Sequence, residues 1–496
     1  MKKKTHLLLA LCTGIVIQGS ISQVYGQSNN FVMIQPGDTE QEIIQKAATL
    51  TPTPRQLRWQ QLELTGFFHF GVNTFTGKEW GDGKEDPQIF NPTQLDAGQW
   101  VRTAKAAGIK QVIITAKHHD GFCLWPTATT KHSVASSPWK NGKGDAVKDV
   151  ADACKKEGIG FGVYLSPWDM NSPLYGSDAY NDFFVQQLTE LLTNYGQVDE
   201  VWFDGANGEG PNGKKQVYDF DRWYKLIRTL QPQAVIAIMG PDVRWVGTET
   251  GYGRQTEWSV VPADNMDPSK IAETSQQDLA FKPQGDMMGD DLGSREKIKN
   301  AKALVWYPAE TDVSIRPGWF FHEKENPKSP EALLDIYFNS VGRNGVLLLN
   351  IPPDKRGLIH EKDIAALTDW KKRRDGIFSK NLVKNKVAKS LGDNNDISSI
   401  AWPQNGFIEI NTKKPITFNV LKLQENISKG QRIEAFELEY KSGDNWVSAT
   451  KGTTVGYARL LRFPNITASS IRLKITQSRL EPNLAELGLY FDPLVK

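Results

Sequence analysis

The chain has 496 residues, which is too long for a single compact core, so two or three domains are expected. Its 39% hydrophobic and 23% charged residues are typical of a globular protein. The formal net charge of +2 provides no strong field to attract nucleic acid or an anionic membrane, so neither is expected as a partner.

The first 26 residues are typical of a secretory signal peptide. Lys2–Lys4 is a charged start, Leu7–Ile17 is apolar, and Val24–Gly26 fits a cleavage site. The apolar stretch is too short to cross a bilayer, and no later segment reaches about 18 apolar residues, so no membrane span is expected. We expect a secreted or periplasmic mature protein, and favour it over a surface lipoprotein attached at Cys12, because leucine directly precedes that cysteine.

Two cysteines remain in the mature chain. Cys154 falls on the buried face of a helix predicted from Val147, Val150 and Ala151, with Gly158 as its stop. We therefore expect Cys154 and Cys123 to be packed thiols rather than a disulfide.

Residues 27–380 are predicted to form the larger domain, in which buried-strand patterns alternate with amphipathic helices. Such repeats favour a (β/α)8-like, TIM-type barrel or a doubly wound sheet. A weak eighth strand near Arg254–Val260 predicts an irregular barrel. The seven clearer strands are Gly66–Gly71, Gln111–Thr115, Gly160–Leu165, Glu200–Asp204, Ala234–Met239, Ala303–Tyr307 and Gly345–Asn350.

Residues 381–496 lack the helical period and are predicted to form a second domain. Short alternating runs, such as Phe436–Tyr440 and Ile471–Ile475, are separated by turn residues. This pattern predicts a C-terminal antiparallel β-sandwich, for which packing against the barrel is favoured over independent sugar binding.

Polar clusters follow three of the predicted barrel strands, where functional side chains of such barrels gather. The first contains His69, with Glu79-Trp80 in the next loop. The second is Lys117–Phe122, which includes His118, His119 and Asp120. The third is Val201–Gly205, where strand alternation points Trp202 and Asp204 together into the barrel mouth.

Several chemistries lack local support. Adjacent strand residues face opposite sides, so His118, His119 and Asp120 form a poor metal site, and no cofactor is expected. Neither a phosphate-binding glycine loop nor a serine nucleophile elbow is present.

Carboxylates, histidines and many tryptophans remain, and these are the residues that bind sugars. Aromatic faces stack on the C–H faces of sugar rings, while polar side chains bind the hydroxyls. Glycoside hydrolysis needs two carboxyls, one charged and one holding a proton. Asp204 supplies the first, and the candidates for the second are Glu249, Glu257 and Glu310.

The motifs Phe68–Phe75, Lys117–Trp125 and Val201–Gly205 together resemble family 29 of the glycoside hydrolases, the α-L-fucosidases. The resemblance runs from about Gln60 to Asn350 and implies a retaining enzyme with a barrel and a C-terminal β-sandwich. It also implies that Asp204 is the nucleophile. The implied fucose-binding residues are His69, Glu79, Trp80, His118, His119, Tyr164 and Trp202, with Arg254 and Trp319 placed less securely.

The stretch from Gly240 to Gly251, followed by Glu257–Ser259, resembles the branch of that family restricted to α1,3- and α1,4-linked fucose. By that resemblance Glu249 is the acid/base, with Glu257 as the runner-up. The expected substrate is terminal fucose on an oligosaccharide or glycoconjugate. A double displacement by Asp204 and Glu249 implies carboxyl groups about 5–5.5 Å apart.

Two other functions stay open from the sequence. A non-catalytic carbohydrate-binding protein would use the same stacking residues, and a metal-dependent hydrolase would use His118, His119 and Asp120. The sequence does not indicate an oligomeric state.

Overall fold

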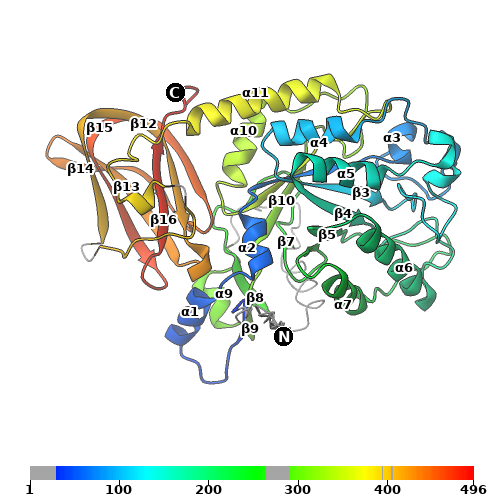
Figure 1. Ribbon diagram of the computed structural model, residues 1–496. Coiled ribbons are helices and arrows are strands. Elements are labelled where there is room, and N and C mark those ends of the chain that lie inside the picture. Colours follow the sequence, from blue (N-terminus) through cyan, green and yellow to red (C-terminus); the bar gives the residue numbers. More distant parts are fainter. Residues whose placement is uncertain (1–28, 264–290, 394, 404–405, 496) are drawn as a thin grey trace, which may run out of the picture.

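The computed structural model describes residues 29–263, 291–393, 395–403 and 406–495. The expected signal peptide therefore lies outside the described residues. The chain forms a barrel lobe and a C-terminal β-sheet lobe, with the long helix α11 (Glu361–Phe378) running along the barrel toward the sheet (Figure 1). Among the described helices, none is both long and apolar enough to cross a membrane.

Eight parallel strands form the barrel. They are, in spatial order, β6 (Val235–Ile238), β5 (Glu200–Phe203), β4 (Gly160–Leu165), β3 (Gln111–Lys117), β2 (Leu64–Phe68), β11 (Val346–Asn350), β10 (Ala309–Ser314) and β7 (Arg244–Trp245). A bridge between Ala237 and Val243 joins the two ends of the sheet, so the barrel is nearly closed. Because all strands are parallel, their C-terminal ends meet at one mouth.

Two of the predicted barrel strands are wrong. Ala303–Tyr307 gives β9 (Ala303–Trp306), which belongs to a separate antiparallel sheet with β1 (Phe31–Met33) and β8 (Val260–Ala263). The segment Arg254–Ser259 is not a strand. The barrel uses β10 and β7 instead: β10 carries inward-facing acids and β7 has only two residues, so neither shows a hydrophobic strand pattern.

Helices cover the outside of the barrel (Figure 1). The prediction around Cys154 is confirmed by α5, which begins after the N-cap Asp145 and ends at Gly158 with a φ of 70°. Within the described residues, the helices other than α11 are α1 (Glu40–Thr49), α2 (Pro54–Gln60), α3 (Val72–Thr76), α4 (Ala97–Ala106), α5 (Ala146–Glu157), α6 (Asp178–Asn194), α7 (Phe220–Leu230), α9 (Arg295–Lys299) and α10 (Pro330–Asn339). Short 3-10 turns occupy Pro87–Ile89, Val134–Ser136, Trp139–Gly142, Lys389–Leu391 and Ile427–Lys429.

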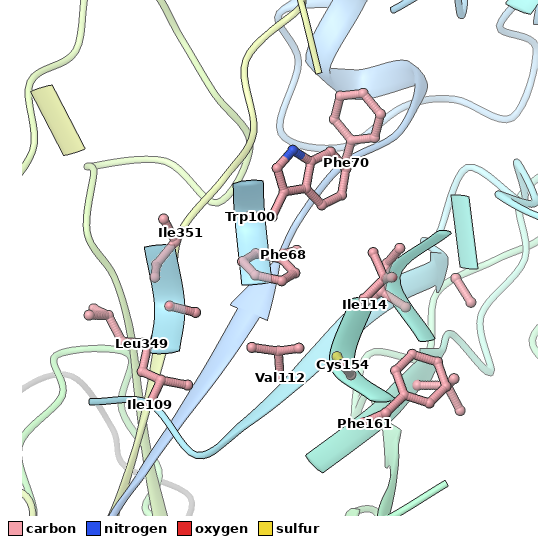
Figure 2. Packing of buried hydrophobic residues seen from close by; sticks show 14 of the residues in the cluster. Phe68, Phe70, Trp100, Ile109, Val112, Ile114, Cys154, Phe161, Leu349 and Ile351 are labelled. Carbon is pink, nitrogen blue, oxygen red and sulfur yellow. The ribbon is translucent and has the colours of Figure 1, made fainter. Parts of the chain in front are cut away.

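The main core lies between the barrel strands and these helices (Figure 2). Phe68 and Val112 from adjacent strands belong to the same buried cluster as Trp100 of α4 and Cys154 of α5. Cys123 and Cys154 are both free and buried, which confirms the expectation of packed thiols. This core holds the strand ends in fixed positions around the mouth of the barrel.

The C-terminal lobe is one hydrogen-bonded antiparallel sheet of five strands, in the order β14-β13-β15-β12-β16. The long strands β12 and β15 change register between Asn411 and Ile416. On one side of this point β15 also pairs with β13, and on the other side β12 also pairs with β16. Both parts of the sheet supply residues to one apolar core, so the lobe is built as a sheet folded around its interior. Its strands are β12 (Phe407–Glu425), β13 (Ile433–Ser442), β14 (Asn445–Gly452), β15 (Arg459–Ser478) and β16 (Leu484–Tyr490).

Lys117, at the end of β3, points into the helix layer rather than the barrel mouth. Its ammonium group is fully buried and forms an ion pair with Asp169, 2.9 Å away. It also donates to the Tyr180 hydroxyl at 3.2 Å and to Gln187 Oε1 at 3.0 Å, both on α6. Removing the cation would leave the Asp169 carboxylate buried without its partner.

We therefore predict that Lys117→Met lowers the free energy of unfolding by about 3–5 kcal/mol. The control is Lys140→Met, which removes an exposed ion pair with Asp149 and should cost less than about 1 kcal/mol. Urea denaturation of both variants measures the difference, and equal losses would contradict the structural role of Lys117.

Candidate active site

A cavity of about 480 Å³ opens at the C-terminal ends of the barrel strands; we call it the C-terminal cavity. Its walls come from β2 to β7, β10 and the loops that follow these strands. The lining residues are Phe67, His69, Trp80, His118, His119, Tyr164, Trp202, Asp204, Gly205, Ala206, Ile238, Trp245, Gly247, Glu249, Asp312 and Trp319.

A larger cavity, of about 1010 Å³, lies at the opposite, N-terminal end of the barrel. Its charged lining residues include Arg58, Lys155, Asp152 and Asp199, and it contains none of the clustered histidines. The C-terminal cavity is the candidate active site because carboxyl, imidazole and indole groups converge there, at the end where parallel barrels carry their chemistry.

Asp204 directly follows β5 and points into the C-terminal cavity with Trp202, as strand alternation predicts. The Tyr164 hydroxyl donates to Asp204 Oδ2 at 3.1 Å, and the backbone N–H of Ala206 donates to Oδ1 at 2.7 Å. His119 Nε2 lies 3.8 Å from Oδ2. The side chain remains 25% exposed, so its carboxylate is held in place while still open to a ligand.

His69 and His119 present unprotonated nitrogens to the cavity. Asn350 donates through Nδ2 to Ser314 and to the Trp319 carbonyl, so its Oδ1 accepts from His69 Nδ1 at 2.9 Å. Ser166 donates to the Trp168 carbonyl and therefore accepts from His119 Nδ1 at 2.7 Å. These networks assign the proton to Nδ1 in both rings.

Both rings, and that of His118, are neutral. Burial lowers the pKa of His69 to about 3, despite the bond to Asn350. Burial also lowers the pKa of His119, where Asp204 opposes the shift. The pKa of His118 falls well below its usual value through burial and the fields of its two neighbours. The Nε2 atoms of His69 and His119 can thus accept hydrogen bonds from hydroxyl groups.

Glu249 supplies the second carboxyl, at the rim of the cavity. The Trp319 indole N–H donates to Glu249 Oε2 at 3.2 Å. Partial burial raises the pKa of Glu249, the Trp319 bond opposes the rise, and the negative charges of Asp204 and Glu79 add to it. Glu249 therefore holds a proton more readily than an ordinary glutamate, and it lines the same cavity as Asp204.

The other two candidates for the second carboxyl are buried away from the cavity. Glu257 is paired with Arg244 and Arg254. Burial alone would raise its pKa, but the two guanidinium groups outweigh burial and lower it, so Glu257 stays ionised. Glu310 lies inside the barrel, where its carboxyl accepts from the Trp202 indole at 2.8 Å.

Two predicted site residues do not line the cavity. Arg254 is buried and forms an ion pair with Glu257. Glu79 lies behind the wall: its carboxylate accepts from the Trp319 backbone N–H at 2.7 Å and contacts His322 Nε2 at 2.6 Å. Glu79 thereby holds Trp319, while Trp80 is 57% exposed at the entrance.

Sequence reasoning did not identify Asp312, Trp245 or Asn350 as site residues. Asp312 lines the cavity and accepts from the Trp245 indole at 2.6 Å. Asn350 is the last residue of a predicted strand, and this position at a strand end could have identified it as a site residue. Asp312 gave no such signal because β10 was not predicted.

His118 Nδ1 and Asp120 Oδ2 are 3.8 Å apart. Within the described part of the chain, no three histidine, cysteine, aspartate or glutamate side chains are grouped to hold a metal ion.

Comparison with known proteins identifies related chains. Residues 40–372 match the family described as alpha-L-fucosidase. Alpha-L-fucosidase 1 of Arabidopsis thaliana is 46% identical over 465 residues, which cover 89% of this chain and 87% of the plant protein.

Solved structures agree over both lobes. A Bacteroides ovatus protein, itself assigned to the α-L-fucosidases, superposes with a TM-score of 0.86 at 52% identity, covering 94% of this chain and 78% of that one. A Ruminococcus gnavus family 29 fucosidase, solved with bound fucose, gives a TM-score of 0.79 at 31% identity and covers 94% and 98% of the two chains.

Proposed function

The chain belongs to the α-L-fucosidases, family 29 of the glycoside hydrolases, and from this premise we propose that Asp204 is its nucleophile and Glu249 its acid/base. The observation that carries the proposal is that both carboxyls line the same cavity and that the pKa of Glu249 is raised above its usual value. A cavity of about 480 Å³ suits one terminal sugar, which supports exo-acting release of fucose.

The proposed reaction has two displacements. Asp204 attacks the anomeric carbon and forms a fucosyl ester, while the C–O bond to the leaving group breaks and that oxygen takes the Glu249 proton. Glu249, now a carboxylate, then removes a proton from water. The resulting hydroxide attacks the same carbon and displaces Asp204, so fucose leaves with net retention.

The surrounding contacts support these roles. Tyr164 and the Ala206 N–H orient the Asp204 oxygens, and the neutral His69 and His119 offer acceptors for sugar hydroxyls. Trp80, Trp202 and Trp319 supply aromatic walls for the sugar ring. His118 and Tyr164 complete the proposed fucose-binding set, and Glu79 acts through Trp319.

We predict that Asp204→Ala abolishes release from both aryl and natural fucosides. Glu249→Ala should lose about 10²–10⁴-fold on natural substrates and much less on an aryl fucoside, because a good leaving group needs little protonation. Steady-state kinetics on both substrates checks this. Glu257→Ala is the comparison, and if it alone spares the aryl fucoside, Glu257 is the acid/base instead.

We further propose that the substrate is fucose in α1,3 or α1,4 linkage. The support is the resemblance of the Gly240–Gly251 stretch, which carries Glu249 and contributes Gly247 to the cavity. On oligosaccharides differing only in linkage and branching, we expect release from α1,3 and α1,4 positions next to galactose. Fast release of simple α1,2-linked fucose, with no gain from a branching galactose, would contradict this assignment.

We also propose that the protein is exported after cleavage near Gln27, on the basis of the charged and apolar pattern of its first residues. Mass spectrometry of the protein from the cell envelope and medium should find a mature N-terminus at about this position. An intact N-terminus in the cytoplasm would refute export, and a lipidated Cys12 would indicate a surface lipoprotein.

A further inference from the structure

Strand β10 carries two acidic residues, Glu310 and Asp312, that both contact indoles inside the barrel. We propose that Asp312 is a further fucose-binding residue, and that it donates a hydrogen bond to a sugar hydroxyl as an uncharged carboxylic acid. This inference rests on the proposed function of the C-terminal cavity.

The geometry fixes Asp312 at the cavity wall. Its side chain lines the cavity although the residue is only 4% exposed. The Trp245 indole N–H donates to Oδ1 at 2.6 Å and so sets the orientation of the carboxyl group. Oδ2 is the oxygen left for a ligand, and a deeply placed group of this kind contacts the sugar that fills the cavity.

The charges around Asp312 disfavour its ionised form. The Asp204 carboxylate faces the same cavity. Within the described residues, no lysine, arginine or histidine forms an ion pair with Asp312. An ionised carboxyl here would be buried beside like charges without a cation, which is costly.

The pKa of Asp312 agrees with this geometry. Burial raises the pKa of Asp312 to about 8, the Trp245 bond opposes the rise, and Glu249 and Asp204 add to it. Near neutral pH the group therefore carries a proton and acts as a donor. The Asp312 donor complements the unprotonated Nε2 acceptors of His69 and His119, which line the same cavity. A sugar hydroxyl both donates and accepts hydrogen bonds, so a cavity with both kinds of group suits it.

Two substitutions separate an uncharged donor from an ionised acceptor. Asp312→Asn keeps an oxygen for Trp245 and an N–H donor for the sugar, whereas Asp312→Leu removes both. We expect the Ki of free fucose as a competitive inhibitor to rise about tenfold or more in the leucine variant, which corresponds to the loss of one hydrogen bond in a dry site. In the asparagine variant, we expect a rise of less than about threefold.

The pH dependence of Tm provides a second readout, which a purely steric role of Asp312 would not change. A carboxyl whose folded pKa is raised costs stability progressively as pH rises from its unfolded pKa of about 3.9 toward about 8. Asp312→Asn removes this cost, so its Tm relative to the parent protein should increase from pH 5 to pH 8. Asp444→Asn, the same change at an exposed turn of the C-terminal lobe, is the control.

The outcomes are distinguishable. Equal rises in the Ki of fucose for Asp312→Asn and Asp312→Leu, no rise in either, or a Tm difference that follows the Asp444→Asn control at every pH would overturn the inference. If the parent protein itself neither binds nor releases fucose, the proposed function fails instead. Our account expects fucose binding by the parent, retention by the asparagine variant and loss by the leucine variant.

Discussion

The C-terminal cavity brings several carboxyl groups together beside histidines that carry no charge, and the rest of the site depends on this imbalance. Asp204, Glu249 and Asp312 all line this cavity. His69 and His119, which line it too, are neutral. Burial raises the pKa of Glu249 and of Asp312, and the charge of Asp204 adds to the rise, because a charged carboxyl favours the protonated form of a carboxyl beside it. The site therefore favours the protonated form of both groups more than water would.

Hydrogen bonds from indoles and amides fix these carboxyls without neutralising them. Trp202 and Trp245 donate to acids on β10, and Trp319 donates to Glu249. An indole N–H donates a single hydrogen bond and carries no formal charge, so it orients a carboxyl and opposes the rise of its pKa without reversing it. The contrast is Glu257, which two arginines hold in the charged form, outside the cavity. A carboxylate locked in this way cannot serve as a proton donor.

The sequence predicted the site where a buried strand runs directly into polar residues. His69, His118, His119 and Asp204 all follow strands with clear hydrophobic patterns, and all line the cavity. Strand β10 escaped prediction because Glu310 and Asp312 occupy its inward positions, and an apolar pattern is the signal by which buried strands are recognised. The apolar Ala303–Trp306 was placed in the barrel instead, although it pairs with β1 and β8 in another sheet. Arg254 was placed by resemblance alone, whereas Glu79 was also indicated by its loop after a predicted strand. Their partners Glu257, Trp319 and His322 lie on irregular loops, where no periodic pattern exists.

The most direct test of the central claim is to trap the covalent intermediate and locate it. A 2-deoxy-2-fluoro-fucosyl fluoride should inactivate the protein, because the 2-fluorine slows both formation and breakdown of the fucosyl ester, while the reactive fluoride leaving group speeds its formation alone. Peptide mass mapping should then find one added fluorofucosyl group on the peptide that contains Asp204, at that residue. An adduct on Glu249, Asp312 or Glu257, or no adduct with an inverted product, would contradict the account.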